Sequence, residues 1–157
     1  MAYDPDLKLL YRCRKWFTLE PFTPKPGGWD NLFLSCISAI HIETGKMAWY
    51  YQTTPGNSWD FTATQPLILA DLRIKGKKRK VIMQAPKNGF FFILDRKTGE
   101  FISAEAFTYV NWANGYDPET GRPIENDFSR YSDVRVELFP GPAGAHSWQP
   151  ICDLFIQ

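Results

Sequence analysis

The sequence predicts an all-β protein built from many short strands. Aromatic residues make up 16% of the 157 residues, and they favour strands, while 11 Gly and 12 Pro supply tight turns. The apolar runs are short and are bounded by Gly, Pro or charged residues, as in 89–94. No long stretch shows the helical period, which excludes a doubly wound α/β domain.

The candidate strands follow one another along the chain. Apolar or aromatic runs occupy residues 7–11, 31–42, 47–52, 66–72, 80–84, 90–94 and 100–104. Turn-forming residues separate them at a spacing typical of antiparallel hairpins. Residues 111–142 lack such runs and are predicted to form a long loop, and a loop of that length in a compact domain is usually functional.

One short motif occurs twice. Residues 39–45 and 93–99 each place a Thr-Gly pair between two candidate strands, and the two glycines, Gly45 and Gly99, lie 54 positions apart. That distance is near the ~40–50-residue period of a propeller blade. The glycine permits a positive φ in the turn, and a polar side chain can bond the turn backbone.

Composition and charge exclude several functions. Lys and Arg total 18 and Asp and Glu total 17, so a net charge of +1 gives no whole-chain field for nucleic acid. One cationic cluster surrounds Gly76 and is predicted to be a solvated hairpin turn: Lys75, Lys77, Lys78, Arg79 and Lys80. No apolar stretch approaches the ~20 residues that span a bilayer, so we expect no membrane span.

The cysteines and the first residues carry little information. Cys13, Cys36 and Cys152 have no metal-type spacing and are predicted to be buried or incidental thiols. Met1–Asp6 has neither the basic start nor the apolar core of a signal peptide, so we expect none in this chain.

Several uncommon strings resemble the quinoprotein alcohol dehydrogenases, which use pyrroloquinoline quinone (PQQ) and calcium. The strongest match is residues 51–66, with Trp59-Asp60 at its centre, and residues 2–7, 30–34, 84–91, 110–113 and 141–146 also agree. The match covers nearly the whole chain except about residues 12–24 and the last six. The resemblance implies an eight-bladed β-propeller of four-stranded blades.

Measured against that family, the chain is expected to be an internal fragment. Residues 1–110 would form about two blades, and residues 111–157 a long loop and the start of the next strand. Ala39, Thr44, Gly45 and Trp49 fit the blade repeat of the family, whereas His41 replaces its Asp, and we expect local weakening there rather than loss of the turn.

The resemblance also implies roles for two residues. Asp60 would be the catalytic base and a calcium ligand, and Lys87, in Pro86-Lys87-Asn88-Gly89, would contact the quinone oxygens. The implied reaction is oxidation of primary alcohols to aldehydes by Asp-assisted hydride transfer to the quinone. Thr62 stands where lanthanide-using relatives place a second Asp, so the resemblance implies the calcium type, and His146 is assigned no role.

Partners and location follow from the same resemblance. It implies a small alcohol as substrate, a cytochrome c-type electron acceptor and a periplasmic location. The alternative is a noncatalytic propeller that serves as a scaffold or assembly protein and binds partner proteins. Such proteins share the Thr-Gly-x-x-x-Trp repeat but lack the strings around Asp60 and Lys87.

One segment departs from the family. Arg12–Pro21 replaces a Gly-Asn-Gly-Ser-Pro-Trp loop whose Asn binds calcium, and one possible coding string restores that loop when it is shifted by one base. The departure is explained by a local frameshift, and the chain as a whole is interpreted as a frameshifted gene model, a pseudogene product or a truncated gene. Since Asp60 alone cannot supply about 6–8 oxygen ligands, we expect the fragment to bind neither PQQ nor calcium and to be inactive alone.

Overall fold

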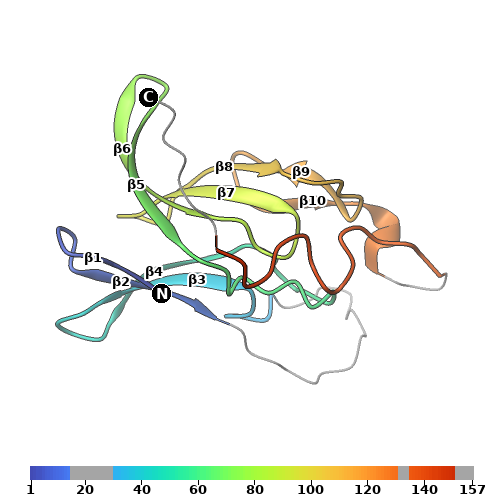
Figure 1. Cartoon of the computed structure of the whole chain (residues 1–157), viewed down its shortest axis with the longest axis horizontal. Coiled ribbons are helices and arrows are strands. Elements are labelled where there is room, and N and C mark those ends of the chain that lie inside the picture. The colour runs from blue at the N-terminus through green and yellow to red at the C-terminus, as the bar shows by residue number, and fades with distance from the viewer. Residues whose placement is uncertain (15–29, 131–134, 151–157) are drawn as a thin grey trace.

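The computed structural model describes residues 1–14, 30–130 and 135–150, and within them it is all-β, as predicted. These residues form ten strands and a single 3-10 helix (Figure 1). The strands make two four-stranded sheets and one two-stranded sheet. Sheets of four strands with almost no helix agree with the expected propeller architecture.

The two large sheets are antiparallel and follow the chain order. The first contains β1 (Ala2–Asp4), β2 (Leu9–Arg14), β3 (Cys36–His41) and β4 (Met47–Gln52). The second contains β5 (Ile68–Ile74), β6 (Lys77–Gln84), β7 (Phe90–Asp95) and β8 (Phe101–Ala106). In Figure 1 the β5–β6 hairpin curls away from the first sheet at its tip, where the predicted cationic turn lies.

A small hairpin lies within the segment that was predicted to be a long loop. It is formed by β9 (Ala113–Tyr116) and β10 (Pro123–Glu125), and the 3-10 helix η1 (Asp127–Arg130) follows it. Its turn contains a third Thr-Gly pair, Thr120-Gly121, which the sequence analysis did not recognise as a repeat.

The turns of the second sheet and of the small hairpin are closed in the same way. Asp95 Oδ1 accepts hydrogen bonds from the N–H (3.1 Å) and hydroxyl (3.2 Å) of Thr98. Asp117 Oδ1 accepts the same two bonds from Thr120, at 2.7 and 2.9 Å. An Asp three residues before the Thr therefore caps the turn through its own carboxylate.

The turn at His41 keeps the backbone bonds of this arrangement. The Gly45 N–H donates to the His41 carbonyl at 2.8 Å, and the His41 N–H donates to the Lys46 carbonyl at 2.9 Å. The turn is thus retained although its first residue is no longer an Asp.

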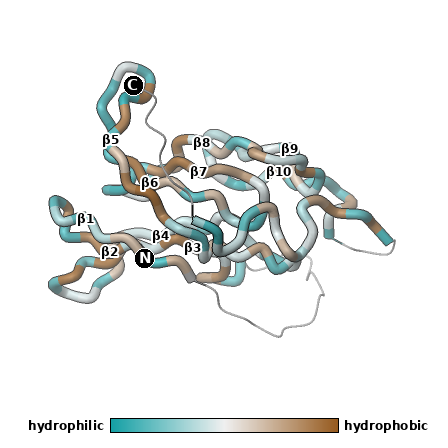
Figure 2. Tube along the Cα trace, viewed as in Figure 1, coloured by the Kyte–Doolittle hydropathy of each residue, from teal (hydrophilic) through white to brown (hydrophobic). Residues whose placement is uncertain are grey.

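The main core lies between the two four-stranded sheets. Trp49 of β4 packs against Tyr11 of β2, with ring centroids 5.8 Å apart, and both donate to the Arg96 carbonyl in the β7–β8 turn, at 3.2 and 2.8 Å. Ile82 and Leu94 of the second sheet complete this cluster. Figure 2 shows hydrophobic stretches along β2 and β6, the strands that supply part of it.

A buried ion pair also joins the sheets. Arg96 Nε lies 2.5 Å from Asp4 Oδ2, and an Arg96 terminal nitrogen donates to the Ala70 carbonyl at 3.0 Å. Burial acts to raise the pKa of Asp4, but hydrogen bonds from the Leu7 N–H and Arg96, together with the Arg96 charge, hold that pKa below its usual value.

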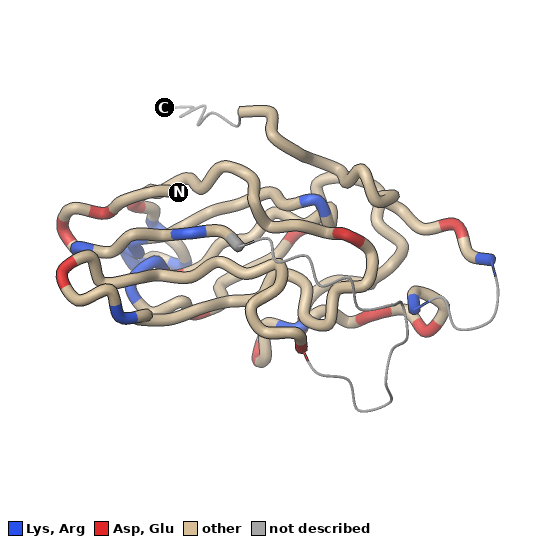
Figure 3. Tube along the Cα trace, turned by 90° about the horizontal axis from the view of Figure 1, so that it is seen from below, with Lys and Arg blue, Asp and Glu red and all other residues tan. Residues whose placement is uncertain are grey.

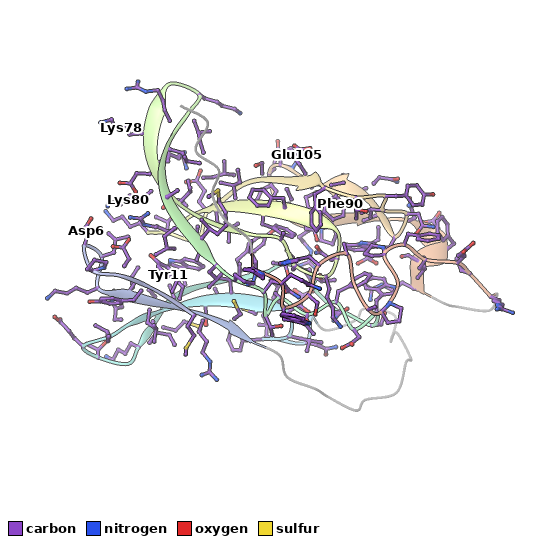
Figure 4. All side chains as sticks on the ribbon, in the orientation of Figure 1. Asp6, Tyr11, Lys78, Lys80, Phe90 and Glu105 are labelled. Atoms are coloured by element: carbon purple, nitrogen blue, oxygen red, sulfur yellow. The ribbon has the colours of Figure 1, made fainter. Side chains whose placement is uncertain are left out.

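A second, exposed pair joins the sheets nearby. Lys80 Nζ lies 2.8 Å from Asp6 Oδ2, and the two residues are labelled in Figure 4. In Figure 3, segments with Lys and Arg (blue) and segments with Asp and Glu (red) lie close together at the left end of the view. Among the described residues, no helix is both long and apolar enough to cross a membrane.

Candidate functional site

Asp60 lies in the connection between the two sheets, between two buried aromatic residues. Trp59 and Phe61 stack on each other with ring centroids 5.7 Å apart, and both pack on Trp112. Because the neighbours on both sides are buried, the Asp60 side chain lies at the surface, where it is 45% exposed. The packing of this loop therefore presents one carboxylate to solvent.

The backbone of this loop is held by Asn57. Its Oδ1 accepts hydrogen bonds from the Trp59 N–H at 3.1 Å and the Phe61 N–H at 3.2 Å. Its Nδ2 donates to Ser35 Oγ and to the Phe61 carbonyl, each at 3.2 Å. Asp60 itself adopts a φ of 61°, a left-handed conformation that Asp tolerates better than most residues.

Lys87 lies in the connection between β6 and β7 and contacts Asp60. Its ammonium lies 3.1 Å from Asp60 Oδ2, 3.3 Å from the Asp60 carbonyl and 3.0 Å from the Pro142 carbonyl. Its side chain is only 14% exposed. The structure thus brings together the two residues that the sequence resemblance singled out.

The neighbour of Lys87 is a buried polar anchor. Asn88 Nδ2 donates to the Thr53 carbonyl at 3.2 Å and the Thr54 hydroxyl at 3.1 Å, and the Asn88 carbonyl accepts from the Trp112 indole at 2.8 Å. These bonds join the β6–β7 connection to the segment after β4. Since every bond is buried, the backbone that carries Lys87 is fixed on both sides.

Residues 141–146 cover the other side of Lys87. The Ala145 N–H donates to the Lys87 carbonyl at 2.9 Å, and a Cβ placed on Gly144 would lie 2.3 Å from Lys87 Cγ. His146 Nδ1 lies 2.6 Å from the Ala85 carbonyl, so His146, which was assigned no role, is a hydrogen-bonded part of this cover.

The described residues contain no cluster of typical metal-binding side chains. They contain no group of three or more His, Cys, Asp or Glu placed to hold a metal, and Asp60 contributes one carboxylate of the about 6–8 oxygens that calcium takes. Burial raises the pKa of Cys13 to about 11, so its thiol is neutral near pH 7 and a poor ligand. Residues 15–21 of the departing segment, and Cys152, lie outside the described residues.

The Asp60–Lys87 pair does fit one part of a quinone site. An ammonium held in place, with few exposed atoms, can donate to a carbonyl oxygen that gains negative charge. An adjacent exposed carboxylate can accept a proton from a hydroxyl group. The donor set therefore suits a quinone oxygen and an alcohol, and it offers one carboxylate to a metal ion.

Sequence reasoning missed the residues that hold this pair. Asn57 could have been suspected, because Gly56-Asn57 is a turn signal just before Trp59. Asn88 gives no such signal, since its partners lie 34 and 35 residues away in the chain.

Comparison with known proteins places these features in context. Residues 1–105 match the PQQ family described as "Glucose/ethanol/alcohol dehydrogenase, beta-propeller domain". The chain is 55% identical over 152 residues to quinohemoprotein alcohol dehydrogenase ADH IIB of Pseudomonas putida, covering 94% of this chain and 22% of that protein. It is 56% identical over 154 residues to quinohemoprotein alcohol dehydrogenase of Comamonas testosteroni, covering 96% of this chain and 21% of that protein.

Solved structures agree with the sequence matches. The crystal structure of the Comamonas testosteroni enzyme superposes with a TM-score of 0.87 at 49% identity, over 95% of this chain and 22% of that one. A europium-containing methanol dehydrogenase gives a TM-score of 0.85 at 37% identity, over 95% of this chain and 26% of that one. The chain thus spans about a fifth of the length of the curated relatives it matches.

Proposed function

The chain belongs to the family of PQQ-dependent alcohol dehydrogenases, and from this premise we propose that Asp60 and Lys87 are its contribution to the reaction centre of a PQQ- and calcium-dependent dehydrogenase of primary alcohols. The supporting observation is the contact of 3.1 Å between Lys87 Nζ and Asp60 Oδ2, held between two fixed loops. Residues 1–110 would supply two blades of the propeller, and residues 111–157 a long loop and the start of the next strand.

The two side chains have separate tasks in this proposal. Asp60 accepts the hydroxyl proton of the alcohol and contributes one oxygen to calcium. Lys87 donates a hydrogen bond to a quinone oxygen and favours negative charge there. When bound, PQQ supplies the hydride acceptor and calcium acts as a Lewis acid.

Three further features complete the proposal. Thr62 adds no carboxylate beside Asp60, which favours calcium over a lanthanide in the site. A cytochrome c-type acceptor is supported by the name of a relative, "1-butanol dehydrogenase (cytochrome c)" of Thauera butanivorans, 49% identical over 139 residues. A periplasmic location follows from the family resemblance.

We also propose that the 157-residue chain alone does not oxidise alcohols, because Asp60 provides one metal ligand and the described residues contain no group of three or more His, Cys, Asp or Glu placed to hold a metal. The direct test is alcohol-dependent dye reduction by the purified chain with added PQQ and calcium. We expect none. Turnover that Asp60→Asn abolishes would contradict this part of the proposal.

A chimera tests the roles of the two residues. In the Comamonas testosteroni enzyme, the matching segment is replaced by this chain, once with Arg12–Pro21 as it stands and once with the Gly-Asn-Gly-Ser-Pro-Trp loop restored. Only the restored chimera is expected to oxidise alcohols. In that chimera Asp60→Asn should lower kcat by about 10²–10⁴, whereas Glu105→Gln, at an exposed carboxylate on β8, serves as the control. A fully active Asp60→Asn chimera would refute the assignment.

A further inference from the structure

Arg130, the last residue of η1, contacts the loop that carries Asp60. The Arg130 guanidinium carbon lies 4.3 Å from the centre of the Trp59 ring, which is a cation–π distance. One terminal nitrogen of Arg130 also donates to the Gly56 carbonyl at 2.5 Å. The same arginine therefore touches the start of the loop and the residue immediately before Asp60.

Arg130 is itself oriented by a second residue. Glu125 of β10 accepts from Arg130 Nε at 2.7 Å and from a terminal nitrogen at 2.5 Å, one bond at each carboxylate oxygen. Such a two-point pair fixes the plane of the guanidinium as well as its position. The neighbouring Ser129 carbonyl accepts the Trp59 indole N–H at 2.7 Å, so the end of η1 binds Trp59 at two points.

The backbone conformation of Asp60 gives these contacts with the loop a structural purpose. A φ of 61° is uncommon for a residue with a side chain, although Asp tolerates it better than most, and contacts around the loop stabilise it. Asn57 fixes the N–H groups on either side of Asp60 from within the loop. Arg130 and the Ser129 carbonyl fix the Trp59 side chain from outside the loop, and Trp59 is the residue directly before Asp60.

We propose that Arg130 is a positioning residue, which acts through Trp59 to hold the Asp60 carboxylate against Lys87. The proposal relies on the proposed function only for the task given to Asp60, since the geometry stands without PQQ or alcohol. In this proposal the segment formed by β9, β10 and η1 has a function, which is to place Arg130 beside the loop that carries Asp60.

The test measures how fast Lys87 reacts with an amine-acylating ester, followed by mass spectrometry on the full chain. The Lys87 ammonium donates to two oxygens of Asp60 and to the Pro142 carbonyl. Displacement of Asp60 should therefore make the Lys87 amine more accessible to the ester. In Arg130→Gln the rate at Lys87 should rise about fivefold, the factor that corresponds to one lost cation–π contact. Arg130→Lys keeps the charge without the two-point pair and should give an intermediate rate.

Two controls separate positioning from general loosening. Lys80, paired with Asp6, should react at an unchanged rate in the Arg130 variants. Arg122, in the turn between β9 and β10, donates to both carboxylate oxygens of Asp30. Arg122→Gln removes this pair and should leave the acylation rate of Lys87 unchanged.

Several results would overturn the proposal. These are an unchanged rate at Lys87 in Arg130→Gln, an equal rise at Lys80, or an equal effect of Arg122→Gln. If Arg130→Gln does not fold, the rate in Arg130→Lys decides in the same way. The measurement contains neither quinone nor alcohol, so loss of the proposed activity in the chimera leaves its outcome unaffected.

Discussion

The Trp49 indole occupies the space where a side chain at Gly99 would be. A Cβ built on Gly99 would lie 2.7 Å from Cδ2 and Cε3 of Trp49, so the last strand of the first sheet reaches the turn of the second only because position 99 is a glycine. Gly99 also has a φ of 79°.

Gly99→Ala should therefore destabilise the protein in two ways. Strain at positive φ costs about 1–2 kcal/mol, and crowding against Trp49 adds about 1–3 kcal/mol. Gly45 is the matched control, because it occupies the same turn position at φ 67° with nothing within 4 Å. Urea unfolding should show a larger loss for Gly99→Ala than for Gly45→Ala, and equal losses would contradict the packing argument.

Gly144→Ala should disturb the Asp60–Lys87 pair without touching Asp60. The new Cβ would lie 2.3 Å from Lys87 Cγ and 2.9 Å from its Cα, so either the lysine or the covering segment must move. We expect the acylation rate of Lys87 to rise severalfold. Gly141→Ala, with nothing within 4 Å, is the control, and the prediction is wrong if the two variants behave alike.

His41→Asp should stabilise the first turn. Asp95 and Asp117 each accept, on a side-chain carboxylate oxygen, hydrogen bonds from the N–H and hydroxyl of a Thr three residues later. In the first turn the Thr44 N–H donates instead to the His41 backbone carbonyl, at 3.3 Å. Restoring the carboxylate should add about 1 kcal/mol to the free energy of unfolding. The reciprocal change Asp117→His should lose a similar amount, and thermal unfolding of both variants checks the pair.

The Asp4–Arg96 pair should make stability depend on acid pH. The pKa of Asp4 is lowered on folding, so its contribution is complete above the usual value of 3.8 and is lost as pH falls through the lower folded value. Asp4→Asn should cost about 1.5–3 kcal/mol near neutral pH, because Arg96 loses its buried carboxylate partner and keeps only the more exposed Asp71, whose Oδ1 lies 3.0 Å from an Arg96 terminal nitrogen. The difference between wild type and variant should shrink below pH 3.8 in urea titrations, and a constant difference would exclude this pair as its source.

The strands of the two large sheets were largely predictable, because their signals are local. The run at 47–52 coincides with β4, and the run at 90–94 differs from β7 by one residue. β1 was missed because three residues carry no period. β9 and β10 were missed because their sequence is polar and is stabilised by packing, with Tyr116 buried against Phe90.

The site divides in the same way. Asp60 and Lys87 were named because the strings around them are distinctive, and the structure brings their side chains together. Asn88 and Arg130 act through partners far away in the chain, 35 residues to Thr53 and 74 to Gly56, and no local pattern encodes such contacts. Their roles follow only from the folded arrangement.

The five-residue Asp-x-x-Thr-Gly turn is held mainly by hydrogen bonds between its own residues. The bonds join the carboxylate, hydroxyl and amide groups of the turn itself. The turn therefore needs few contacts with the rest of the protein, and it can close a hairpin wherever two short strands meet. The copy that begins at Asp117 closes the β9–β10 hairpin, which belongs to neither four-stranded sheet. The same short turn can therefore close a hairpin outside the four-stranded sheets, because its side-chain bonds do not depend on a neighbouring sheet.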